Sequence, residues 1–98
     1  MTIVNRPAAV PDDLAPVPQV VATYATYLRA RAHAAPSATV SGDQAEVSLS
    51  IGDKTLVLAF HCNHREWALR RAEVRRGEQA ATFTRGELTE AVGALLEP

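Results

Sequence analysis

Hydrophobic alternation is clearest between residues 44 and 62, where two short segments flank a turn at Gly52-Asp53. A two-residue loop that begins with glycine is typical of a tight β-hairpin, and this loop pairs Ile51 with Lys54. Counting outward aligns apolar residues across the hairpin: Leu49 with Leu56, Val47 with Leu58, and Ala45 with Phe60. The turn and the alternation therefore predict one register and one continuous core face.

A third strand is expected after a turn at Asn63-His64. Pairing across this turn sets Phe60 opposite Trp67, Leu58 opposite Leu69, and His61 opposite Glu66. Simple alternation would then bring charged side chains to the core face, namely Arg71, Glu73 and Arg75. We therefore predict a β-bulge near Arg70-Arg71 that turns Ala72 and Val74 inward, whereas without a bulge these two residues would join the second face.

Helical patterns precede and follow these strands in the sequence. Apolar residues recur at three- and four-residue spacing from about Pro18 to Ala34, and they form a stripe of Val17, Val20, Val21, Tyr24 and Leu28. Pro36 ends this helix. A second helix, running to about Leu96, is expected to bury Leu88, Ala91, Val92, Leu95 and Leu96.

The remaining signals complete the predicted fold. Gly77-Glu78 indicates another hairpin loop, followed by a short strand over about 79–83. Thr84 and Glu87 have the spacing of a capping box, which begins the second helix. The turn signal at residues 41–43 precedes the first strand. We thus expect an α+β fold with the order helix, four-stranded antiparallel β-meander, helix, and with both helices on one face of the sheet.

Composition suits one domain, because the chain has 98 residues and 47% hydrophobic content. Prolines concentrate near the amino terminus, so residues 1–17 are expected to form a flexible proline-rich arm and residues 18–98 a single α+β domain. The first ten residues lack the apolar core of a signal peptide, and no segment approaches the roughly 18 consecutive apolar residues of a membrane span. We expect a cytoplasmic protein.

Candidate chemistry is sparse. Cys62 is the only cysteine, which excludes an intrachain disulfide and a cysteine-pair zinc motif. His61, Cys62 and His64 form the tightest reactive cluster, but His61 and Cys62 are successive strand residues and point to opposite faces. We expect no catalytic, cofactor-binding or metal-binding residues, and no enzyme activity; a Cys62-dependent enzyme or metal site is the weakest alternative.

Arginine residues concentrate in the second half of the chain. Ten basic and eleven acidic residues give a net charge of -1, which argues against nucleic-acid binding through overall charge but leaves room for a local patch. The candidate contacts to an anionic partner, either phosphates or an acidic protein surface, are Arg65, Arg70, Arg71, Arg75, Arg76 and Arg85. The alternative is a solvated edge on which these arginines pair with neighbouring glutamates.

The second face of the sheet provides the main functional clue. On the strand from residue 54 to residue 62, this face carries small or weakly polar side chains, whereas a face in contact with water usually carries plainly polar ones. We therefore predict a homodimeric regulatory or adaptor module that pairs sheet on sheet, with edge-strand pairing as the alternative geometry. The predicted dimer interface consists of Val57, Ala59, His61, Ala68 and Arg70.

The basic residues are almost all arginine, with Lys54 the only lysine, and alanine is abundant. Such a composition is typical of the GC-rich coding sequences of actinobacteria. In its size, its richness in arginine and alanine and its lack of catalytic motifs, the chain resembles the small developmental regulators of actinomycetes, of which the BldB type is one. This resemblance implies a regulatory role in development or transcriptional control. We expect a protein partner, and the alternative is a nucleic-acid-binding module that uses the arginine-rich strand from Arg65 to Arg85.

Overall fold

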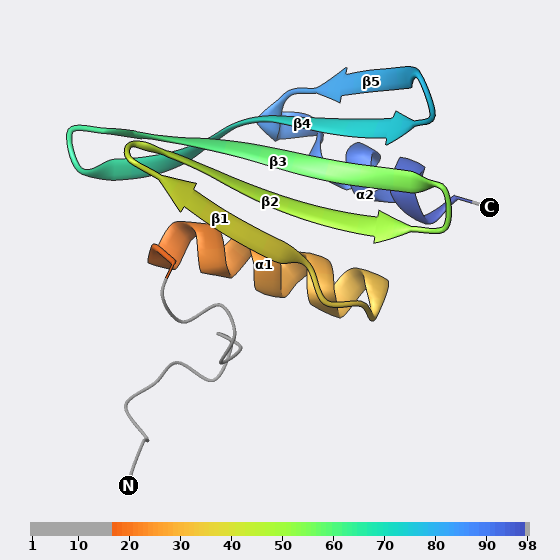
Figure 1. Cartoon of the computed structure of the whole chain (residues 1–98), viewed down its shortest axis with the longest axis horizontal. Coiled ribbons are helices and arrows are strands. Elements are labelled where there is room, and N and C mark those ends of the chain that lie inside the picture. The colour runs from red at the N-terminus through yellow and green to blue at the C-terminus, as the bar shows by residue number, and fades with distance from the viewer. Residues whose placement is uncertain (1–16, 98) are drawn as a thin grey trace, which may run out of the picture.

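The computed structural model describes residues 17–97 as a five-stranded antiparallel sheet with one helix before the strands and one after them (Figure 1). The elements are α1 (Gln19–Ala32), β1 (Ser37–Ser41), β2 (Gln44–Ile51), β3 (Lys54–Asn63), β4 (Glu66–Arg76), β5 (Gln79–Phe83), a 3-10 turn η2 (Arg85–Glu87) and α2 (Leu88–Leu96). The predicted arm, residues 1–17, lies outside the described residues except for Val17.

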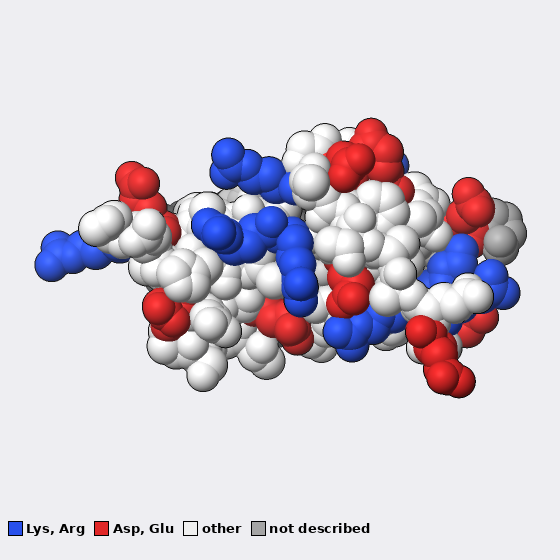
Figure 2. Space-filling model, turned by 90° about the horizontal axis from the view of Figure 1, so that it is seen from above, with Lys and Arg blue, Asp and Glu red and all other residues white. Residues whose placement is uncertain are grey.

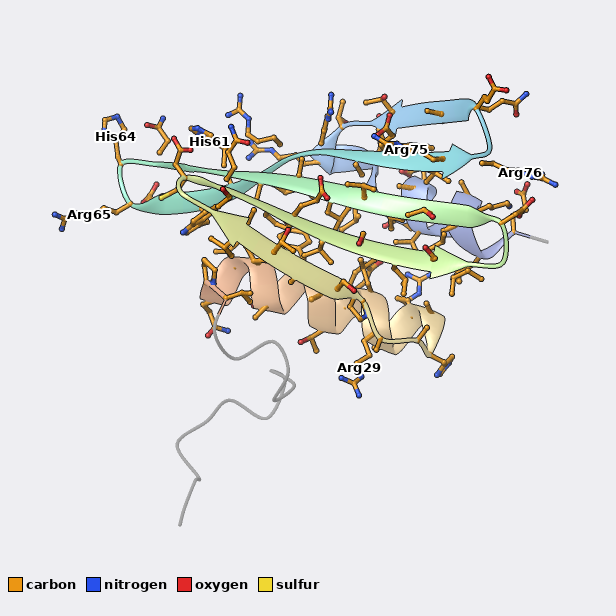
Figure 3. All side chains as sticks on the ribbon, in the orientation of Figure 1. Arg29, His61, His64, Arg65, Arg75 and Arg76 are labelled. Carbon is orange, nitrogen blue, oxygen red and sulfur yellow. The ribbon has the colours of Figure 1, made fainter. Side chains whose placement is uncertain are left out.

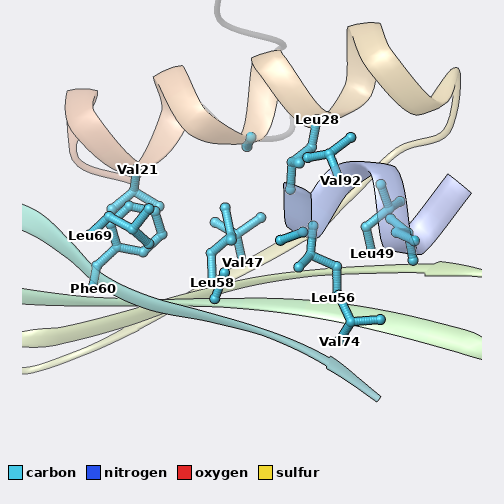
Figure 4. Packing of buried hydrophobic residues seen from close by; sticks show 14 of the residues in the cluster. Val21, Leu28, Val47, Leu49, Leu56, Leu58, Phe60, Leu69, Val74 and Val92 are labelled. Atoms are coloured by element: carbon cyan, nitrogen blue, oxygen red, sulfur yellow. The ribbon is translucent and has the colours of Figure 1, made fainter. Parts of the chain in front are cut away.

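The strands follow one another in the sheet in the order β1-β2-β3-β4-β5, so every described strand pairs with its neighbour in sequence. Side chains of α1 and α2 both join the core cluster on one face of this sheet (Figure 4). The α+β class and the antiparallel meander are therefore confirmed. The predicted number of strands was wrong, because the sheet has five strands instead of four.

The additional strand is β1, over residues 37–41. It pairs with β2 from Ser37 opposite Ser48 to Ser41 opposite Gln44, and Gly42 occupies the connecting turn with a φ of 61°. Four of its five residues are exposed, since β1 lies at the edge of the sheet. Its sequence, Ser-Ala-Thr-Val-Ser, alternates polar and apolar residues, but it contains only two apolar side chains and Val40 is 43% exposed, so the segment is a weak strand signal.

The central hairpin confirms the register predicted from the turn. Leu49 pairs with Leu56, Val47 with Leu58, and Ala45 with Phe60. Leu56 and Leu58 are fully buried beneath the helices, and Phe60 meets the ring of Tyr24 edge-on at 5.4 Å between centroids. Because a slip of one residue would turn all of these side chains toward solvent, burial fixes this register strongly.

The β3–β4 turn lies one residue later than predicted, which shifts the register of the two strands by two residues. The turn residues are His64 and Arg65, both with positive φ (53° and 68°), instead of Asn63 and His64. The observed pairs are Phe60 with Leu69, His61 with Ala68, and Cys62 with Trp67. The predicted pairs of Phe60 with Trp67, Leu58 with Leu69, and His61 with Glu66 are thus wrong. A shift of two residues leaves every side chain on its predicted face, so alternation alone did not reveal the error.

The predicted bulge is confirmed. Phe60 pairs with Leu69 and the preceding Ala59 pairs with Arg71, so Arg70 is an extra residue without a partner in the ladder. Beyond the bulge, Ala72 is fully buried and Val74 is 8% exposed. The bulge therefore lets two successive arginines avoid the core while Leu69 before them and Ala72 after them both face it.

Helix α1 packs through smaller side chains than predicted. Its buried residues are Val21, Ala22, Ala25 and Leu28, whereas Val20, placed in the predicted stripe, is 37% exposed. Alanines at the contact let the helix backbone approach the sheet closely. The helix ends at His33, which adopts the left-handed conformation and donates its backbone N–H to the carbonyl of Arg29, so the helix stops before Pro36.

The predicted capping box is present, but it caps the 3-10 turn η2 instead of α2, which begins at Leu88 with Glu87 as its N-cap residue. The carboxylate of Glu87 accepts hydrogen bonds from the backbone N–H of Thr84 at 3.0 Å and from its hydroxyl at 3.2 Å, as in a capping box. Ala91, Val92 and Leu95 are buried, but Leu96 is 38% exposed because it lies in the last turn at the margin of the core. At that end, Lys54 Nζ donates to the carbonyl oxygens of Ala94 and Glu97.

Candidate interaction face

The face of the sheet opposite the helices, which we call the open face, contains the predicted dimer residues. Val57, Ala59 and His61 alternate along β3 and point away from the core, and Ala68 on β4 lies directly opposite His61. All four are partly buried by neighbouring side chains of the sheet. Arg70 is exposed and lines a shallow groove with Ala59 and His61. The structure thus brings the five predicted residues onto one surface, which no described element covers.

The open face is more polar than its central strand indicates. β2 contributes Glu46 and Ser48 to this face, and β4 contributes Arg71 and Glu73. Ala59 lies between Glu46 and Arg71 in one row across the sheet, and Val57 lies between Ser48 and Glu73 in the next. The small side chains of β3 therefore form a strip flanked by charges of both signs.

The arginines named from the sequence do not form one cluster. Arg65 lies at the tip of the β3–β4 turn and Arg76 at the opposite end of the sheet (Figure 3). Arg85 belongs to η2, beyond the last strand. Only Arg70 and Arg71 lie together, because the bulge places both outside the core, and they line the groove that also includes Gln44 and Asn63. Arg70 has no partner in the ladder, and Val57 pairs with Glu73.

Several charged side chains already have partners. Arg75 binds Glu73 at 2.9 Å and Arg76 binds Asp53 at 3.0 Å. These contacts agree with the alternative in which arginines pair with nearby acidic residues. Figure 2, seen from above, shows basic side chains lying near one another over the left half of the molecule, with acidic side chains around them.

Other charged side chains of the open face have no such partner. Among residues 17–97, neither Glu46 nor Arg71 forms an ion pair, and the same holds for Arg70. All three are exposed. An exposed charge without an ion-pair partner costs little free energy, because water solvates it. These side chains are therefore available to bind another molecule.

The reactive residues near the β3–β4 turn are separated. His61 lies on the open face, where its Nε2 is 3.3 Å from Oδ2 of Asp43, a contact that becomes an ion pair when the imidazole is protonated. Cys62 pairs with Trp67 and is half-buried on the other face. Within the described part of the chain, no group of three His, Cys, Asp or Glu side chains is placed to hold a metal ion.

Sequence reasoning missed two residues that belong to this face. Asp43 precedes β2, and its backbone carbonyl accepts a hydrogen bond from the N–H of Cys62 on β3 at 2.7 Å. Its carboxylate contacts the imidazole of His61. Glu46 was overlooked although its place opposite Ala59 follows from the hairpin register that the turn predicts. Arg71 was named only as a basic residue, since its pairing with Ala59 depends on where the bulge falls.

Comparisons with protein-family models, with curated proteins and with solved structures found no significant match. Neither described helix is both long enough and apolar enough to cross a lipid bilayer.

Proposed function

We propose that this protein is a non-enzymatic binding module that forms a homodimer through the open face. The observation that carries the proposal is the one-sided arrangement of the helices, which leaves the second face of the sheet uncovered by any part of residues 17–97. Along its centre, Val57, Ala59 and Ala68 present small side chains that are already partly desolvated by their neighbours. Burying them against a second sheet therefore removes apolar area from water with little loss of side-chain entropy.

The proposed biological role is regulatory or adaptor-like. Its support is the resemblance to small actinomycete developmental regulators, which rests on size and composition, together with a surface suited to protein contacts. A dimer of this kind acts by binding, so its partners are expected to be proteins, and a role in developmental or transcriptional control follows from the resemblance alone.

The variant Ala59→Glu is expected to convert the dimer to a monomer without unfolding it. The new carboxylate would lie in the middle of the interface, where its desolvation opposes association, whereas in the monomer it remains in water. Sedimentation equilibrium at micromolar concentration measures the change, and circular dichroism checks that the fold persists. Thr89→Glu is the matched control, because Thr89 is exposed on α2, on the helical side of the molecule.

Two results would contradict the proposal. A wild-type protein that sediments as a monomer at these concentrations removes its main support. A dimer that persists in Ala59→Glu shows that association uses another surface, with the edge strands β1 and β5 as the alternative, since each offers one unpaired side within the described sheet.

A nucleic-acid-binding function is the second candidate, and the bulge is the observation that favours it. Arg70 and Arg71 lie side by side in a shallow groove and form no ion pair within residues 17–97, so both guanidinium groups are free to bind phosphates. The pairing of Arg75 and Arg76 with acidic residues reduces their contribution.

If nucleic acid binds in this groove, replacing both Arg70 and Arg71 with alanine should abolish most of the binding at low salt, because binding depends on the release of counterions from phosphates. Replacing Arg75 and Arg76 provides a control with the same change in net charge and should have a smaller effect. Fluorescence anisotropy with labelled duplex DNA and single-stranded RNA at several salt concentrations measures both. Failure of the wild-type protein to bind either probe at low salt would eliminate this function.

A further inference from the structure

We infer that the two copies of the homodimer pack with their two-fold axis parallel to β3, so that Glu46 of each copy pairs with Arg71 of the other. The inference rests on the proposed homodimer and specifies its geometry. It follows from the row of residues that crosses the middle of the open face and from the charges within that row.

In this row, Glu46 on β2 pairs with Ala59 on β3, and Ala59 pairs in turn with Arg71 on β4. Residues that lie directly opposite in an antiparallel sheet point to the same face, and neighbouring strands are about 4.8 Å apart. The Cα atoms of Glu46 and Arg71 therefore lie on opposite sides of β3, at similar distances from that of Ala59. Alanine has no atoms beyond Cβ, so it leaves space above the centre of the row.

A two-fold axis that runs along β3 above Ala59 exchanges the two sides of that strand. β2 of one copy then lies over β4 of the other, which brings Glu46 over Arg71 of the second copy, and symmetry repeats the contact. Packed sheets are about 10 Å apart, a gap that a glutamate and an arginine extending from opposite sheets are long enough to span. Each contact joins two charges that have no ion-pair partner within residues 17–97.

The other face-to-face arrangement is electrostatically unfavourable. An axis that lies between the sheets but runs across the strands would set β2 over β2 and β4 over β4. Glu46 would then meet Glu46, and Arg71 would meet Arg71, because the row would be superposed on itself without reversal. Like charges brought together at an interface oppose association, so the charges of this row select the axis along β3.

Charge reversal tests the geometry directly. Glu46→Arg alone would set an arginine opposite Arg71 at each of the two contacts, and Arg71→Glu alone would set a glutamate opposite Glu46 at each. Each single variant is therefore expected to weaken self-association about tenfold or more, and the double variant Glu46→Arg/Arg71→Glu should regain most of the lost affinity. A mixture of the two single variants should form heterodimers, since both contacts are then complementary.

Analytical ultracentrifugation of each protein, and of the mixture with one variant fluorescently labelled, measures these affinities. Glu90→Arg on the exposed side of α2 is the control for a charge reversal away from the open face. Restoration by the double variant together with heterodimer formation supports the geometry. If the single variants dimerise as tightly as the wild type, the proposed geometry is wrong, although the homodimer itself stands. A monomeric wild type would contradict both the geometry and the proposed function.

Discussion

Deletion of Glu73 is expected to unfold the domain, whereas deletion of Arg70 in the same strand is expected to leave it folded. Without Arg70, Leu69 still faces the core, Arg71 still faces outward, and Ala72 still faces the core, so the strand regains simple alternation. Without Glu73, Val74 would move to the open face and Arg75 would enter the core opposite Leu56. Burial of an unpaired arginine costs several kcal/mol, a large part of the roughly 5–15 kcal/mol that stabilises a typical domain.

The two deletions form a matched pair, since each removes one charged residue from β4. For the Arg70 deletion we expect a loss of about 1–2 kcal/mol in the free energy of unfolding, the ordinary range for a single change, because the local twist of the bulge is lost. Circular dichroism and urea denaturation distinguish the outcomes. If both deletions unfold the domain, Arg70 is required for folding even though its loss leaves every other side chain of β4 on its own face, and the predicted difference between the two deletions is wrong.

Leu58→Ala is expected to lower the free energy of unfolding by about 3 kcal/mol. Leu58 is fully buried at the centre of β3, under both helices, so truncation leaves a cavity that the surrounding side chains fill only partly (Figure 4). Leu96→Ala is the control, because the same atoms are removed from a side chain that is 38% exposed, and a loss below about 1 kcal/mol is expected there. Urea denaturation followed by tryptophan fluorescence measures both variants. Equal losses at the two positions would contradict the burial of Leu58.

The central hairpin was predictable because two independent signals agree on it. A Gly-first turn sets the pairing of Ile51 with Lys54, and the alternation of leucines sets the same register. The third strand offered only one of these signals. Asn63-His64 and His64-Arg65 are both acceptable turn sequences, and the registers they produce differ by two residues, which exchanges no side chain between faces. Hydrophobic patterning therefore predicts which face a β4 residue occupies, but not which residue it meets.

The candidate site could be predicted only in part, because its residues also depend on the register of the strands. Its β3 residues and Glu46 follow from the predicted hairpin, so their common face was predictable. The position of Arg71 opposite Ala59 required the correct turn and the correct bulge together. β1 was missed for a different reason, since this exposed edge strand has five residues and only two apolar side chains, a pattern too short to distinguish from a loop.

The sequential strand order also has a kinetic consequence. Because each strand of the described sheet pairs with the strand next to it in sequence, hairpin closure involves short loops and a small entropic cost at every step. The helices, at the two ends of the described chain, dock on a sheet whose strands can form locally. Of the described elements, α2 is synthesised last, so the leucines and valines that it covers remain accessible to chaperones until α2 has left the ribosome and docked on the sheet.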